Sequence, residues 1–427
     1  MHSRLDDSTT APRILVLGCR RQLLEAARAL GVRAVVVAGP WERDNCGSLL
    51  GLAHDVVDVD NVTQTDTVLA GLRRSGYGQD AFGGIVAASD EYVGVVAFLE
   101  YFLRGEHARS HPWSALTWRD KFLQKEAVYS AGVTVARSQF IADIHAPLPH
   151  LDVPFPAVVK PAAGAGAAHT SVVRDTDDLR AALELAGKRT TKRTFVVEEF
   201  IDATEYQVDA VVHKGHVLFV SAARYLVNPL ESLDGRIGRA ATVDPAEDPE
   251  LYRTLREMVG RSAAALGVVS SVLHVEAFLR SDGTWVFGEC GVRLGGCFTR
   301  ELVNAKYGID LAAVEIQLSM GVQPDLKENR APGVYCRVFL PTREGLLRRA
   351  LTREELVARP EVCEAEIRYP MGSVLPPPDT NAVTGLGEAV VVGKDLQDAD
   401  RRAVDIAEWH LSVLDVEPVG SSPMRSW

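Results

Sequence analysis

The distribution of apolar positions divides the chain into two kinds of pattern. Over residues 14–110, short apolar runs alternate with stretches in which apolar residues recur at helical spacing. The pattern predicts strands at 14–18, 33–38, 55–59 and 84–88, and helices at 22–30 and 93–103. Such alternation is typical of a parallel sheet built from βαβ units. The turn after the first strand, GCRRQ, lacks the glycines of a G-x-G-x-x-G motif, which argues against a dinucleotide site there.

From residue 113 onward the pattern changes. A helix is expected to begin near Arg119 and to carry Lys121 and Lys125 on one face, because they are four residues apart. An apolar strand then ends at Lys160 and is followed by a loop of glycine and alanine, residues 162–169. The elements expected further on are a strand at 194–201, a hairpin over 206–226 that turns at Lys214-Gly215, and alternating strands and helices in the last hundred residues.

Alternating apolar residues on both sides of Asp282-Gly283 predict a tight hairpin. If the loop has two residues, Glu276 and Glu289 face each other across the ladder, with their Cβ atoms about 5 Å apart. Two opposed carboxylates repel each other unless a cation lies between them. Mg²⁺ is suited to this position because it binds carboxylate and phosphate oxygens. The alternative is a solvent-facing hairpin on which both glutamates are hydrated.

Other residues near this hairpin are candidates for the same site. His274 shares a face with Glu276 because side chains alternate along a strand, so it is either a substrate contact or a hydrogen-bonding core residue. Arg293, four residues beyond Glu289, supplies positive charge. Cys290 and Cys297 lack an obvious histidine partner for nucleophilic chemistry and are expected to pack.

Composition narrows the class of protein. A chain of 427 residues is expected to form two or three packed units. The formal net charge of -11 argues against nucleic-acid binding, which needs a basic surface. The apolar runs are too short to span a bilayer, and the first dozen residues lack the apolar core of a signal peptide, so a cytoplasmic protein is expected. The six cysteines form no C-x-x-C pair, which favours free thiols.

The paired glutamates and the residues after them resemble the ATP-grasp carboxylate–amine ligases, and the resemblance extends over residues 12–417. In that superfamily two acidic residues on adjacent strands hold Mg²⁺, and Glu276 and Glu289 match them. The family's second acidic residue usually begins an E-x-N motif, whose Asn is a further metal ligand. Here the motif reads Glu289-Cys290-Gly291, so the Asn is absent. The following Arg293-Leu294-Gly295-Gly296 is similar to the R-x-G-G segment of the L-amino acid ligase branch.

The resemblance also implies a nucleotide site. The segment 197–201 resembles the hinge that holds adenine and ribose. Glu198 would accept from the adenine amino group, the backbone of Glu199 and Ile201 would pair with the ring edge, and Glu205 would hold the ribose hydroxyls. Taken alone, this segment also fits an edge strand that carries charged residues.

The phosphate side of the site is implied in the same way. Lys160 and Lys121 match the family's two phosphate-binding lysines. The loop at 162–169, with Gly164 and Gly166, would place backbone N–H groups over the β- and γ-phosphates. The chain has no Walker A motif.

The implied architecture is an α/β, multidomain ATP-grasp fold. A Rossmann-like domain with a parallel sheet is expected at 12–112, and a small lid domain with a linker helix at 113–200. A larger mixed-sheet domain would follow at 201–420, with a terminal subdomain from about 333. Relatives of this kind are often dimers, so a homodimer is a further expectation.

The implied chemistry is acyl-phosphate formation from ATP with Mg²⁺, or with Mn²⁺ in its place. An amine then attacks the acyl phosphate, and Arg293 stabilises the oxyanion. The alternative role of Arg293 is a structural ion pair with Glu289. The loop 162–169 and the segment 225–242 are candidate lids. Further candidate substrate contacts are Arg224, Arg239, Gly295 and Gly296.

The expected substrates are two amino acids, or an acid and an amine. The product would be a dipeptide or a γ-glutamyl compound of the kind made in antibiotic and other specialised metabolism. Two alternatives stay open at this point. One is an ATP-grasp ligase or carboxylase of primary metabolism, and the other is a regulatory module that binds nucleotide without catalysis.

Overall fold

The computed structural model describes residues 11–105, 109, 112–233, 235–377 and 385–418. Its N-terminal part contains a parallel sheet with the strand order β3-β2-β1-β4. In β1, β2 and β4 nearly every residue is buried, as expected for parallel strands covered on both faces, whereas the edge strand β3 begins and ends with an exposed Asp. The predicted strands and helices of this part are confirmed within one or two residues. Their bounds are β1 Arg13–Leu17, α1 Arg21–Ala29, β2 Arg33–Ala38, α2 Pro40–Asn45, α3 Gly47–Leu50, β3 Asp55–Asp58, α4 Thr65–Arg74, β4 Gly84–Ala87, η1 Asp90–Tyr92 and α5 Val93–Arg104.

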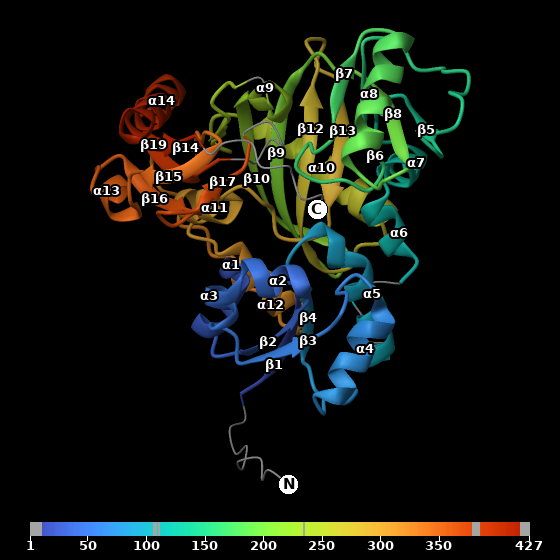
Figure 1. Ribbon diagram of the computed structural model, residues 1–427, viewed down its shortest axis with the longest axis vertical. Coiled ribbons are helices and arrows are strands. Elements are labelled where there is room, and N and C mark those ends of the chain that lie inside the picture. Colours follow the sequence, from blue (N-terminus) through green and yellow to red (C-terminus); the bar gives the residue numbers. More distant parts are fainter. Residues whose placement is uncertain (1–10, 106–108, 110–111, 234, 378–384, 419–427) are drawn as a thin grey trace.

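One helix from far along the chain completes this N-terminal core. Helix α12 (Leu311–Ser319) lies beside α1 and β4 (Figure 1) and contacts β12 of the large sheet as well. Its residues Leu311 and Ile316 are buried in the same apolar cluster as the parallel strands. Gly84 permits the close approach, since a Cβ there would overlap Ser319. The parallel sheet is therefore joined tightly to the rest of the molecule, and the predicted domain boundaries stay a proposal.

The second part is a small antiparallel sheet with the order β5-β8-β6-β7. The helix expected near Arg119 begins at Lys121, because the side chain of Asp120 accepts hydrogen bonds from the amides of Phe122 and Leu123 at 2.9 and 3.0 Å and ends the preceding turn. The elements are α6 Ser114–Arg119, α7 Lys121–Ser130, β5 Ser138–Ile141, β6 Ala157–Pro161, β7 Ser171–Val173, α8 Thr176–Arg189 and β8 Phe195–Glu199.

The third part is built on an eight-stranded sheet with the order β13-β12-β9-β10-β11-β14-β18-β16 (Figure 1). The pairings described for this sheet are all antiparallel, where a mixed sheet was expected. A small sheet, β17-β15-β19, flanks its C-terminal end. The strands are β9 Thr204–His213, β10 His216–Val227, β11 Arg239–Thr242, β12 Ser271–Leu279, β13 Trp285–Gly291, β14 Val334–Leu340, β15 Gly345–Arg349, β16 Val362–Ile367, β17 Val374–Leu375, β18 Gly387–Gly393 and β19 Asp415–Glu417.

Helices cover this large sheet. They are α10 Pro249–Ala265, α11 Thr299–Tyr307, α13 Arg353–Val357 and α14 Leu396–Val413, while the short helix α9 Pro229–Leu233 lies between β10 and β11 in the chain. The predicted hairpin with its turn at Lys214-Gly215 is confirmed as β9 and β10. Within the described residues, no helix is long and apolar enough to cross a bilayer.

Candidate functional site

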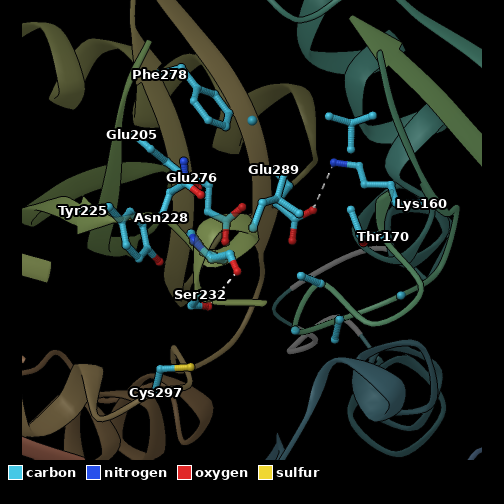
Figure 2. Close-up of a pocket in the computed structure, with 18 of the residues that line it drawn as sticks. Lys160, Thr170, Glu205, Tyr225, Asn228, Ser232, Glu276, Phe278, Glu289 and Cys297 are labelled. Atoms are coloured by element: carbon cyan, nitrogen blue, oxygen red, sulfur yellow. Dashed lines mark hydrogen bonds and ion pairs between the residues drawn. The ribbon is translucent and has the colours of Figure 1, made fainter. Parts of the chain in front are cut away.

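A cavity of about 410 Å³ lies where the small sheet faces the strands β9, β10, β12 and β13 (Figure 2). It is also reached by Asp90 from the N-terminal part and by Arg337 from β14. Most of the residues predicted from the sequence line this one cavity. They are Lys121, Lys160, Gly164, Gly166, Glu198, Glu199, Ile201, Glu205, Arg239, His274, Glu276, Glu289, Arg293 and Gly296.

The predicted pairing of Glu276 with Glu289 is confirmed, but the hairpin reaches it by a different route. The amide of Arg280 donates to the carbonyl oxygen of Thr284 at 2.9 Å, so the loop has one residue more than the two expected. A bulge between β12 and β13 at Gly288 then restores the predicted register. Gly288 is required there, because a Cβ would lie 2.8 Å from the carbonyl oxygen of Glu276.

Two lysines lie over Glu289. The Nζ of Lys121 is 2.9 Å from Glu289 Oε2, and the Nζ of Lys160 is 3.8 Å from the same oxygen (Figure 2). Burial acts to raise the pKa of Glu289, but Lys121 and Lys160 outweigh it and lower this pKa to about 2. Glu289 is therefore negatively charged at neutral pH, with two lysine side chains beside it.

The other two carboxylates on this face are less fully compensated, although Lys160 acts to lower the pKa of both. Phe278 pairs with Glu205 across β12 and β9, which places Glu205 diagonal to Glu276 on the same face of the sheet (Figure 2). Burial, followed by repulsion from Glu289, raises the pKa of Glu276. Burial and Glu276 raise the pKa of Glu205 well above its usual value. Oxygen donors in this arrangement are suited to a hard cation such as Mg²⁺.

Lys125 is a site residue to which the sequence analysis gave no role. Its side chain is only 2% exposed, and its Nζ lies 3.5 Å from Glu198 and donates to the carbonyl oxygen of Gly288. Burial lowers its pKa. Its spacing from Lys121 was the available signal, but a helical pattern cannot show that the second lysine points into a cavity.

The hinge segment, residues 197–201, has a buried hydrogen-bond acceptor that the described residues do not use. Glu198 is 5% exposed and forms an ion pair with Lys160 at 3.0 Å, yet its Oε1 has no hydrogen-bond partner among the described residues. The amide of Glu199 donates to the carbonyl oxygen of Arg137 at 2.8 Å, and its side chain pairs with Arg280. The N–H of Glu199 is therefore already used, and any ring contact by this backbone falls to its carbonyl or to Ile201.

The loop at 162–169 is surrounded by basic side chains. Lys121 donates to the carbonyl oxygen of Gly164 at 3.0 Å, and Lys192 donates to that of Ala163 at 2.7 Å. Gly166 and Ala167 have φ values of 61° and 55°, so the loop turns sharply at this point. Burial and nearby positive charge lower the pKa of Lys192. Unbalanced positive charge beside a turn of this kind is suited to phosphate.

Gly291 stands where the E-x-N motif has its Asn, and two charged side chains lie close to it. A Cβ on Gly291 would lie 3.3 Å from Asp90 Oδ1 and 3.5 Å from the guanidinium carbon of Arg293. Asp90 and Arg293 form an ion pair, each with 15% of its side chain exposed. Arg293 therefore pairs with Asp90 of the N-terminal part, and its suggested pairing with Glu289 is not the one formed. Burial raises the pKa of Asp90, but Arg293 overcomes this and the net shift is downward.

Of the candidate substrate residues, His274 and Arg239 line the cavity and Arg224 does not. His274 lines the cavity and its Nδ1 lies 2.8 Å from Asp209 Oδ1, so its ring orientation is fixed. Arg239 also lines the cavity, with its guanidinium bound to Asp400 at 2.6 Å. Arg224 was predicted wrongly, because it lies on the opposite face of β10, beside Tyr206.

Gly295 lies behind His274 rather than in the cavity wall, and a Cβ there would lie 2.8 Å from His274 Nδ1. Cys290 is buried in the core behind the hairpin, as expected. Cys297 lines the cavity and has a φ of 53°. Among the described residues, no group of three or more His, Cys, Asp and Glu side chains is placed to hold a metal ion.

Comparisons with known proteins agree with this geometry. A protein-family profile for the ATP-grasp domain matches residues 153–301. The L-arginine-specific L-amino acid ligase of Bacillus subtilis is 25% identical over 330 residues, which covers 76% of this chain and 78% of that protein.

Two solved structures show the same fold. The L-amino acid ligase from Bacillus licheniformis superposes with a TM-score of 0.78 at 17% identity and covers 96% of this chain and 100% of that one. The biotin carboxylase domain of 2-oxoglutarate carboxylase from Hydrogenobacter thermophilus, in complex with MgADP and bicarbonate, gives 0.69 at 14% identity and covers 95% of this chain and 90% of that one.

Proposed function

Because this chain carries an ATP-grasp domain and has the ATP-grasp fold, we propose that the protein is an ATP-dependent carboxylate–amine ligase for amino acids. It phosphorylates the carboxylate of one amino acid and joins the resulting acyl group to the amine of a second, which gives a dipeptide or γ-glutamyl product, ADP and phosphate. The observation that carries the proposal is the opposed pair Glu276 and Glu289, which lies beneath Lys121 and Lys160 in the cavity.

ATP enters with its base at the hinge. Glu198 has a buried oxygen that accepts no hydrogen bond from the described residues, and this oxygen accepts one from the adenine amino group. Glu205 holds the ribose hydroxyls. The phosphates lie under the loop at 162–169, with Lys121 and Lys160 against them. These two lysines exchange part of their contact with Glu289 for contact with the phosphates.

Glu276 and Glu289 are the residues that would hold Mg²⁺, and the remaining ligands would come from phosphate and water. The fit rests on the set of oxygen donors, because Glu276 and Glu289 oppose each other on adjacent strands. Burial and repulsion from Glu289 raise the pKa of Glu276, as expected for a site that a further cation would stabilise. When bound, the ion would withdraw charge from the phosphates during transfer.

Transfer of the γ-phosphoryl group to a carboxylate oxygen gives an acyl phosphate. The incoming neutral amine attacks its carbonyl carbon, and the carbonyl oxygen becomes an oxyanion. When the oxyanion collapses, the C–O bond to phosphate breaks and the nitrogen loses one proton, which the departing phosphate takes up. Arg293 reaches the cavity from the end of β13, and Asp90 fixes its direction, so it is placed to stabilise that oxyanion. The loop at 162–169 and the segment 225–242 both contribute lining residues, which supports a role for them in excluding water from the acyl phosphate.

The choice of amino acid substrates is supported by the relatives. Two proteins called L-amino acid ligases resemble this chain over most of its length, one in sequence and one in structure. The Glu289-Cys290-Gly291 and Arg293-Leu294-Gly295-Gly296 segments point to the same branch.

The test is incubation with ATP and Mg²⁺ against a matrix of paired amino acids. ADP, phosphate and the mass of any condensed product are recorded together. Glu289→Gln is expected to abolish all three, while Glu247→Gln, at an exposed position outside the cavity, is expected to leave them unchanged. Tight ATP binding without turnover across the whole matrix would contradict the proposal and indicate a regulatory module.

A further inference from the structure

One end of the cavity is lined by residues to which neither the nucleotide nor the metal gives a role. Arg337 and Phe339 come from β14, Arg368 follows β16, and Tyr225 lies on β10. Figure 2 shows Tyr225 and Cys297 on the side of the glutamates away from Lys160. This end of the cavity therefore lies beyond the metal pair as seen from the phosphate lysines.

Arg337 is unusual because its side chain is buried and not all of its N–H groups have hydrogen-bond partners. Its side chain is 2% exposed, and its Nη1 donates to the carbonyl oxygen of Cys297 at 2.6 Å. Its Nε has no partner among the described residues. A buried guanidinium with an unused donor costs stability unless a further acceptor is supplied.

The nearby carboxylate does not form a hydrogen bond with Arg337. Glu388 faces Phe339 across β14 and β18, and its Oε1 lies 4.0 Å from Arg337 Nη1, too far for a hydrogen bond. Its other oxygen is bonded to Arg368. Within the cluster of Arg337, Arg368 and Glu388, the carboxylate therefore binds Arg368, which also lies near Glu366. Arg337 has no hydrogen-bonded carboxylate among the described residues.

Aromatic rings hold Arg337 in place. Its guanidinium carbon lies 5.2 Å from the ring centre of Phe339 and 5.8 Å from that of Tyr225. Contact with the faces of two rings restricts the guanidinium plane and leaves its N–H groups at the edges. A planar donor fixed in this way is suited to a carboxylate.

The cluster also lies beside the proposed reaction centre. Cys297, whose carbonyl accepts from Arg337, directly follows the Arg293–Gly296 segment. Cys297 and Phe298 have φ values of 53° and 57°, a conformation that non-glycine residues rarely adopt. Arg337 stabilises this turn and at the same time faces the cavity next to it.

We propose that Arg337 and Arg368 form a subsite for the non-reacting carboxylate of an amino acid substrate. This inference rests on the proposed function and deepens it, because it selects amino acids over simple amines and amides. The non-reacting carboxylate belongs either to the acceptor or to a donor with two carboxylates, and the experiment below distinguishes the two sources.

The first measurement is thermal stability in the presence of a non-hydrolysable ATP analogue and Mg²⁺. Each of the twenty amino acids is compared with its C-terminal amide. At least one amino acid is expected to raise the melting temperature more than its amide does. Arg337→Met is expected to remove that difference, Arg337→Lys to keep part of it, and Arg353→Met, an exposed arginine of the same region, to keep all of it.

The second measurement uses the substrate pair found by the activity screen. Amidation of the reacting carboxylate abolishes ADP formation, whereas amidation of the carboxylate bound by the subsite raises KM about ten- to a hundredfold. Arg337→Met should raise the KM for that substrate to a similar extent and leave the KM for ATP within about twofold. Arg368→Met serves as the second variant if Arg337→Met does not fold.

The inference is overturned if no amino acid binds better than its amide, or if the preference for the free acid persists in both arginine variants. Failure of the proposed function has a different signature, namely no ADP formation with any pair. Because binding is measured separately, a protein that binds the free acid but forms no product would retain the subsite and lose only the ligase assignment.

Discussion

Replacing Gly291 with Asn creates the E-x-N motif that the sequence lacks, and we predict that it lowers activity. A Cβ at this position lies 3.3 Å from Asp90 Oδ1 and 3.5 Å from the guanidinium carbon of Arg293. Alanine therefore requires a shift of only a few tenths of an ångström. The amide of Asn extends beyond Cβ into the space that the carboxylate and guanidinium occupy. The ion pair must break or move before Asn can fit.

The magnitude follows from the ion pair. Each partner has 15% of its side chain exposed, so the charge-assisted hydrogen bond is partly protected from water. Such bonds contribute about 1.5–3 kcal/mol. If Arg293 loses this orientation in the transition state, kcat falls roughly 10- to 100-fold. Gly291→Ala should lose roughly threefold or less, and Asp90→Asn should resemble Gly291→Asn.

The assay is steady-state ADP release with the identified substrate pair, together with urea unfolding of each variant. Gly47→Asn is the matched control, since a Cβ at Gly47 would meet no atom of the described residues within 4 Å. If Gly291→Asn is as active as the unmodified protein, or more active, the Asp90–Arg293 pair does not occupy the place of the motif Asn. Loss of stability without loss of kcat would contradict the catalytic role of Arg293.

Three further predictions address the metal pair, the bulge and a histidine outside the site. Chelation with EDTA should abolish ADP formation, and Mg²⁺ or Mn²⁺ should restore it, while activity unaffected by EDTA would contradict the metal site. Gly288→Ala should disturb the Glu276–Glu289 register and lower Mg²⁺ affinity measured by activity titration, with about 1–3 kcal/mol of lost stability from overpacking; unchanged affinity would count against the bulge. Burial lowers the pKa of His410 to about 4, below its usual value near 6.5, so only the unfolded chain takes up a proton between those pH values. Stability should therefore be complete above about pH 6.5 and fall toward pH 4 by up to about 3 kcal/mol, and urea unfolding of His410→Gln across this range should lack that contribution.

The sequence was most informative where a pattern is local. Alternation around Asp282-Gly283 identified the two strands and the pairing of Glu276 with Glu289. It did not identify the longer loop or the bulge at Gly288, and these two deviations offset each other. The pairing was therefore correct although the assumed turn was not. Loop length depends on backbone detail that alternation does not encode.

Contacts between distant segments could not be predicted in this way. Asp90 and Arg293 are 203 positions apart, and nothing in either local pattern shows that they meet. The docking of α12 against the N-terminal sheet is of the same kind. Arg224 was named as a candidate substrate contact, but Tyr225 and Val227, on the other face of β10, line the cavity instead. Alternation shows which residues share a face but not which face lines the cavity.

Transfer of an isotope label distinguishes acyl-phosphate formation, the proposed activation step, from other uses of ATP. The donor amino acid is labelled with ¹⁸O in its reacting carboxylate, and the products are followed by ³¹P NMR and mass spectrometry. The account predicts ADP together with phosphate that carries one ¹⁸O atom from the donor. AMP that carries the label, with pyrophosphate as the second product, would contradict it and indicate adenylation instead.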